Sequence, residues 1–110
     1  MAKQKSDTPI LELLAGMTAQ SIEASTLDEE ALMMVRIAAL VAVDAPPASY
    51  LLNLGAAGEM GVDEEQVTGI LAAIAPIVGT ARVAAAAGNI ARALGFAIAL
   101  AEAEAEEEEE

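Results

Sequence analysis

Residues 61–74 read GVDEEQVTGILAAI, and they predict the end of one helix and the start of the next. Gly61 suits the position just after a helix, because glycine adopts the left-handed backbone conformation without steric cost. Asp63 and Gln66 form a capping box, in which each side chain binds the backbone N–H of the other residue. Apolar residues then recur with the spacing of one helix face, at Val67, Ile70, Leu71 and Ile74. We expect this helix to begin after Asp63 and to end at Pro76.

Two helices are predicted near the N-terminus. Pro9 suits a first helical position, and the apolar residues after it have helical spacing, which predicts a helix over 9–24. Thr26 and Glu29 form a second capping box, which opens a helix that runs to about Val43. That helix is apolar around almost its whole circumference, so we expect it to be buried or to lie in an interface.

Two further helices complete the prediction. Pro46 and Pro47 end the second helix and begin a third over 47–60. After Gly79, an alanine-rich stretch predicts a long last helix over about 81–100. Strand signals are nearly absent, so the sequence predicts an all-α fold of five to six helices.

The chain of 110 residues predicts a single domain with distinct ends. Residues 1–8 are polar and are expected to form a flexible arm, and residues 9–101 form the helical domain. Residues 102–110 hold seven glutamates. Negative charge opposes the helix dipole at a helix C-terminus, and neighbouring glutamates repel each other, so we expect this acidic tail to be disordered.

Composition favours self-association. Hydrophobic residues make up 55% of the chain, above the usual level of about 45–50%. Alanine provides 27 of them, whereas there is one Tyr, one Phe and no Trp. Each buried side chain therefore removes little apolar surface from water. We expect the helices to pack closely and to finish their burial in a homo-oligomer.

Composition also excludes several functions. The chain has no Cys and no His, which removes thiol chemistry, disulfides and the commonest acid–base and metal-binding side chain. The net charge of −13 argues against nucleic-acid binding. No apolar run is long enough and free enough of charge to span a membrane. We expect a soluble cytoplasmic protein without metal, cofactor, membrane or nucleic-acid partner.

The order of these segments resembles the carboxymuconolactone decarboxylase family, which includes the alkylhydroperoxidase D-like proteins. The resemblance covers about residues 27–95, and it is most specific in GVDEEQV at 61–67 and IVGTAR at 77–82. It implies an alkylhydroperoxidase D-like all-α fold that assembles as a homo-oligomer, commonly a trimer or a hexamer.

The family's peroxidase branch carries the motif Cys-x-x-Cys-x-x-x-His, and the resemblance places it here on Pro46, Ser49 and Asn53. An upstream glutamate of that branch falls on Met34. None of the four residues can supply the thiolate or the proton relay, so thiol peroxidase activity is excluded and no catalytic residue is assigned. Decarboxylase activity is doubtful for the same lack of histidine. Natural loss of the motif and its deliberate removal both fit the sequence.

Six residues form a candidate pocket on this resemblance: Met34, Arg36, Pro46, Ser49, Tyr50 and Asn53. Arg36 is the only charge between Ala31 and Val43, and it either anchors an anionic ligand or pairs with a carboxylate such as Glu23, Glu59 or an acid of a neighbouring subunit. We favour the ion pair, because buried arginines are nearly always paired. The polar residues either orient a ligand or bond to the backbone in a degenerate pocket, and we favour the second interpretation.

Arg82, Asn89 and Arg92 fall on about one face of the last helix, since seven and ten residues are close to whole turns. They predict either a polar stripe that lines the channel of an oligomer, or an ordinary solvated face or salt bridges between subunits. We favour the second interpretation.

Our leading hypothesis is a non-catalytic member of the family that acts as an oligomeric structural or assembly module, with a small residual pocket. The alternative is a small-molecule lyase or metabolite-binding protein that uses Arg36, Tyr50 and Asn53. The expected partner is a copy of the chain itself.

Overall fold

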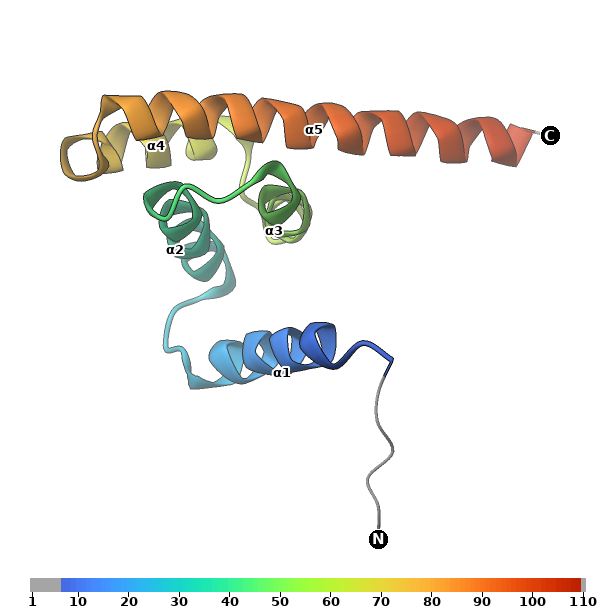
Figure 1. Ribbon diagram of the computed structural model, residues 1–110, viewed down its shortest axis with the longest axis horizontal. Helices are drawn as coiled ribbons and strands as arrows, with labels where there is room; N and C mark the ends of the chain where they lie inside the picture. Colours follow the sequence, from blue (N-terminus) through green and yellow to red (C-terminus); the bar gives the residue numbers. More distant parts are fainter. Residues whose placement is uncertain (1–6, 110) are drawn as a thin grey trace, which may run out of the picture.

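A computed structural model describes residues 7–109, and it contains five helices in that range (Figure 1). They are α1 (Pro9–Ala24), α2 (Glu29–Ala42), α3 (Pro47–Glu59), α4 (Glu64–Val78) and α5 (Thr80–Glu109). No strand occurs in this part of the chain, which confirms the all-α prediction. Most of the predicted flexible arm, residues 1–6, and the last residue of the acidic tail lie outside the described residues.

Helices α2 to α5 form the body of the molecule. In Figure 1, α5 runs along the longest axis with α4 beside its first half, while α2 and α3 lie across them and are seen nearly end-on. α2 packs against α3, α4 and α5. α4 and α5 are joined by Gly79 alone, and they run in opposite directions. α5 also packs against α2, α3 and α4, so α2 and α5 each contact the other three helices of the body.

The core consists of two adjoining clusters along α2. Val41 of α2 lies in the first cluster, with Tyr50 of α3 and Ile90 of α5. Met33 and Ile37 of α2 lie in the second cluster, which reaches α3 and α4. The remaining buried members are mostly small or β-branched: Ala45, Ala57, Val62, Ile70, Ala86 and Ala93. Small side chains at these positions let the helix backbones approach closely.

Helix α1 stands apart from this body. None of its residues is buried, and Figure 1 shows it on the far side of α2 and α3 from α5. Arg36 of α2 connects to it by hydrogen bonds from the guanidinium to the Thr18 carbonyl, at 3.4 Å, and to the Ser21 hydroxyl, at 3.1 Å. The radius of gyration, 16.4 Å, exceeds the roughly 13 Å expected of a compact domain of this length.

Two helix ends adopt the same C-terminal capping motif. After α3, Gly61 has a φ of +95°, and the Val62 N–H bonds to the Ala57 carbonyl at 2.9 Å. After α2, Asp44 takes the equivalent position with a φ of +56°, and the Ala45 N–H bonds to the Leu40 carbonyl at 3.0 Å. This is the Schellman arrangement, in which a left-handed residue turns the chain back onto the last helical carbonyls.

The structure confirms the predicted helix starts, with the exception of the cap of α2. The capping box of Asp63 and Gln66 is present, with both reciprocal hydrogen bonds at 2.8–3.0 Å. The prediction that Thr26 and Glu29 form a second box was wrong. Asp28 caps α2 instead, because its carboxylate is the one that accepts from the Ala31 N–H, at 2.8 Å.

Two predicted helix ends also differ from the structure. α4 continues through Pro76 to Val78, because the missing N–H so close to the end costs a single hydrogen bond, and the Gly79 N–H still bonds to the Ala75 carbonyl at 2.9 Å. α5 continues from the expected end near residue 100 to Glu109. Alanine and glutamate both have high helix propensity, which outweighs the repulsion between neighbouring carboxylates.

None of the five helices in residues 7–109 combines the length and apolar character needed to cross a membrane.

We predict opposite effects for alanine at two glycines. Gly61→Ala should lower the free energy of unfolding by about 1 kcal/mol, because an L side chain is strained at positive φ. Gly69→Ala, inside α4 with open space around its Cα, should raise it by up to about 1 kcal/mol. Chemical denaturation of both variants measures the difference. A Gly61→Ala variant as stable as the parent would contradict the capping geometry.

Candidate functional site

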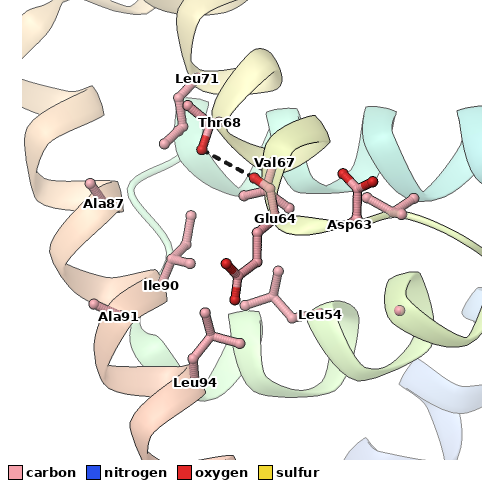
Figure 2. A pocket seen from close by; sticks show the side chains of 12 residues that line it. Leu54, Asp63, Glu64, Val67, Thr68, Leu71, Ala87, Ile90, Ala91 and Leu94 are labelled. Atoms are coloured by element: carbon pink, nitrogen blue, oxygen red, sulfur yellow. Dashed lines mark hydrogen bonds between the residues drawn. The ribbon is translucent and has the colours of Figure 1, made fainter.

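An apolar groove of about 600 Å³ lies between α3, α4 and α5 (Figure 2). Leu54 of α3 forms its floor, Val67 and Leu71 of α4 form one wall, and Ile90 and Leu94 of α5 form the other. Ala87 and Ala91 on α5 leave the second wall low. The complete lining also includes Gly58, Val62, Asp63, Glu64 and Thr68.

The groove has an acidic rim at the start of α4. Figure 2 shows the Glu64 side chain extending across the mouth between Leu54 and Leu94. The Asp63 carboxylate already accepts one hydrogen bond within the protein, from the Gln66 N–H of the capping box. The hydroxyl of Thr68 donates to the Glu64 backbone carbonyl at 3.1 Å, so it is turned into the helix. The Glu64 carboxylate makes no hydrogen bond within the described residues.

The negative charge of this rim continues onto α2. The Gln66 side-chain amide donates to the Glu30 carboxylate, which brings the starts of α2 and α4 together. Glu29 and Glu65 lie next to these two residues in the chain and are exposed. One end of the molecule therefore presents carboxylates from both helix starts, beside the mouth of the apolar groove.

The groove combines apolar contact surface with negative charge. The groove offers aliphatic side chains and carboxylates, and within the described residues no group of three or more acidic side chains comes close enough to hold a metal ion. An apolar surface that carries a positive charge at one end would match both features of the groove.

The six residues of the predicted pocket do not line this groove. Met34 packs against the second core cluster, and Pro46 is exposed at the start of α3. The Arg36 guanidinium bonds to α1 as described above, and it has no carboxylate partner among residues 7–109. The Asn53 side chain donates to the Ser49 carbonyl one turn earlier, at 2.9 Å.

Tyr50 lies at the centre of the first core cluster. Its side chain is fully buried, and its hydroxyl has no hydrogen-bond partner among the described residues. Burial raises the pKa of this phenol, and the negative charge of Asp44 raises it further. Tyr50 therefore acts in packing, since it is enclosed among apolar neighbours such as Val41 and Ile90.

The predicted stripe on α5 converges on the end of α2. Arg82 donates to the Ala42 carbonyl at 2.6 Å, and the Asn89 amide donates to the Ala45 carbonyl at 3.3 Å. Arg92 donates to the Asn89 side-chain oxygen at 3.3 Å. Arg82 thus caps the C-terminus of α2, where a cation meets the negative end of the helix dipole. These bonds give the stripe a structural role within one chain.

Two smaller cavities flank this stripe. One, of about 360 Å³, brings Asp44 and Arg82 together at the turn between α4 and α5. The other, of about 390 Å³, lies between the start of α3 and Arg92, and its lining is almost wholly apolar.

Sequence reasoning missed the groove. The sequence predicts that Val67 and Leu71 belong to one apolar face of α4, but their spacing does not indicate what covers that face. Ile90 and Leu94 have the same i, i+4 spacing on α5. A sharper signal was the pair Ala87 and Ala91, also spaced i, i+4, because these small side chains leave space beside α4 unfilled.

No protein-family model matches the chain, and neither a curated protein nor a solved structure matches it.

We predict that Tyr50→Phe raises the free energy of unfolding at neutral pH by about 1 kcal/mol, because it removes a buried hydroxyl that has no partner. The raised pKa also makes the folded state disfavour the phenolate. Stability that is fully present below about pH 10 is therefore lost as the pH rises through the higher pKa of the folded state. Denaturation at several alkaline pH values should show this loss in the parent and a smaller loss in Tyr50→Phe. A less stable Tyr50→Phe variant would show that the hydroxyl is bonded.

We predict that Arg82→Met lowers the free energy of unfolding by about 1 kcal/mol, because the Ala42 carbonyl loses its cap. Arg92→Met is the control, because the Arg92 guanidinium donates to the side-chain oxygen of Asn89 and not to a helix carbonyl. This substitution should lower the free energy of unfolding by less than about 0.5 kcal/mol. Equal losses in the two variants would argue against the capping role.

Proposed function

We propose that this chain is a non-catalytic helical assembly module, related to the carboxymuconolactone decarboxylase family, that buries its remaining apolar surface against copies of itself. The exposed apolar surface of α1 is the observation that supports this proposal. All six of its large apolar side chains are 45–66% exposed: Ile10, Leu11, Leu13, Leu14, Met17 and Ile22.

A helix like α1 needs a packing partner. Isolated helices of this length, 16 residues, are marginal in water, because helix formation has a costly nucleus. Two hydrogen bonds from Arg36 do not replace the burial of an apolar face. Contiguous exposed apolar surface of this kind marks an interaction site. Leu52 of α3 and Ile77 of α4 are also exposed, at 78% and 89%.

Catalysis has little support in this chain. The residues proposed for a lyase reaction are engaged elsewhere: Arg36 binds α1, Asn53 binds its own helix, and Tyr50 is enclosed in the core. The absence of Cys and His removes the nucleophile and the proton relay of the family's peroxidase branch.

Binding of a small molecule is a second candidate function, because the groove has a suitable size. Its volume of about 600 Å³ falls within the range of small-molecule sites, about 300–1,000 Å³. The acidic rim would favour an apolar ligand with a cationic group. A thermal-shift screen of hydrophobic amines would support this function if saturable stabilisation were lost in Ala87→Glu, which fills the groove, and retained in Ala85→Glu on the opposite side of α5.

We predict that the purified chain forms a closed assembly of defined mass, because exposed apolar surface is buried most economically by symmetric copies. Size-exclusion chromatography with light scattering should give a multiple of the 11.2 kDa chain mass, with three or six copies favoured by the family resemblance. A mass of 11.2 kDa maintained at micromolar concentration would refute the assembly role.

A further inference from the structure

Two apolar surfaces of this chain lack a partner among the described residues, and they are complementary to each other. We propose that α1 of one copy docks into the α3–α4–α5 groove of a second copy, with the N-terminal end of α1 at the acidic rim. This inference rests on the proposed self-association, and it specifies which surfaces meet and in which direction.

α1 has the pattern of a helix that binds in a groove. Ile10, Leu13, Leu14 and Met17 are spaced i, i+3, i+4 and i+7, which is the anchor pattern of helix-in-groove recognition. All four side chains are more than half exposed. Glu12 and Ala19 project from the opposite side of the helix, at about 180–200° from Ile10, so the charged side would face water.

The groove is shaped for side chains of such a helix. A helix is about 10 Å across, so the cavity of about 600 Å³ accepts one apolar face and leaves the rest of the helix outside. Val67 and Leu71 on one wall and Ile90 and Leu94 on the other supply aliphatic contacts from two antiparallel helices. The low wall at Ala87 and Ala91 provides the room that the incoming side chains need.

Charge sets the direction of docking. The sequence before α1 carries Lys3 and Lys5, two of the five basic residues of the chain. The groove mouth carries Asp63 and Glu64, with Glu30 next to them through Gln66. Placing the N-terminal end of α1 at this rim brings opposite charges together and adds the positive end of the helix dipole.

The chain's own groove does not allow this direction. Residues 25–28 join α1 to α2, and four residues span at most about 14 Å. The start of α2 lies beside the rim, because Glu30 contacts Gln66. If α1 folded into its own groove, this short linker would bring its C-terminal end, with Glu23, to the acidic rim. The N-terminal end of α1 would then lie about 24 Å from the rim, because the helix is 16 residues long. A second copy has no such restriction.

Single-cysteine variants test the contact directly, since the chain has no cysteine of its own. Met17→Cys and Ala87→Cys chains, one of them carrying a C-terminal tag, are mixed and oxidised. We expect a mixed disulfide dimer that contains both chains, identified by its mass on a non-reducing gel. Ala85→Cys, on the opposite side of α5, replaces Ala87→Cys as the control and should give at least tenfold less mixed dimer. Equal yields from the two positions would overturn the proposal.

The doubly substituted chain separates docking in a second copy from docking in the same chain. With Met17→Cys and Ala87→Cys together, linkage between chains supports the proposal. A disulfide that closes within one chain overturns it. Dimers formed only between two Met17→Cys chains also overturn it, because they would show α1 packing against α1.

Assembly variants supply a second readout. Leu14→Asp, in the anchor face, should raise the dissociation constant of the assembly at least tenfold, whereas Ala19→Asp adds the same charge on the opposite side of α1 and should leave the constant unchanged. Circular dichroism confirms that both variants keep the helical body. A parent that is monomeric refutes both the assembly role and this contact. An assembly that survives Leu14→Asp unchanged refutes only the contact.

The direction of docking has its own test. Lys3→Glu combined with Lys5→Glu should weaken the assembly severalfold at low salt, and added salt should reduce the difference from the parent. A double variant that assembles as tightly as the parent at low salt would overturn the proposed direction.

Discussion

The packing of three helices onto α2 is the constraint on which the rest of the structure depends. α2 buries Met33, Ile37 and Val41 almost completely; Val41 belongs to the first core cluster, and Met33 and Ile37 belong to the second. The surrounding helices pack against it mainly with small residues, such as Ala86 and Ala93 of α5. Backbones can then come close, but the apolar area removed from water per residue stays small. The body is therefore held by the fit around one helix and not by bulky side chains.

The ends of α2 receive corresponding support from other elements. Asp28 caps its start, and Asp44 turns the chain at its end. Arg82, from a helix forty residues away in the sequence, closes the Ala42 carbonyl. The polar face of α5 thus stabilises the central helix, while its thin, alanine-rich face leaves a groove beside α4. A single helix supplies both the cap of the core and one wall of the candidate binding surface.

Local signals in the sequence were sufficient for most helix boundaries. Proline at the start of α1 and the paired Asp63 and Gln66 at the start of α4 act within one turn, so they can be identified without knowledge of the fold. Thr26 does not cap α2, because the Asp28 carboxylate offers a hydrogen-bond acceptor closer to the helix. α5 extends beyond its predicted end, because the helix propensity of alanine and glutamate outweighs the repulsion between carboxylates.

The positions of elements relative to one another could not be predicted in the same way. Arg36 was expected to meet a carboxylate, yet its position on α2 places the Thr18 carbonyl and the Ser21 hydroxyl of α1 within reach. The six residues of the pocket expected from the family resemblance do not line the groove, and Met34 and Tyr50 instead pack in the core. Which apolar face is covered and which is left open is a property of three-dimensional packing.

The junction at Gly79 has a consequence for how the chain tolerates insertions. A single residue separates α4 from α5, so this connection is too short to accommodate an inserted residue without moving one of the helices. One added residue at the start of α5 would turn the remainder of that helix by about 100°, carrying Ala86, Ile90 and Ala93 out of contact with α2. The phase of the longest helix is thus set by its connection, and viable length variation is confined to the other loops.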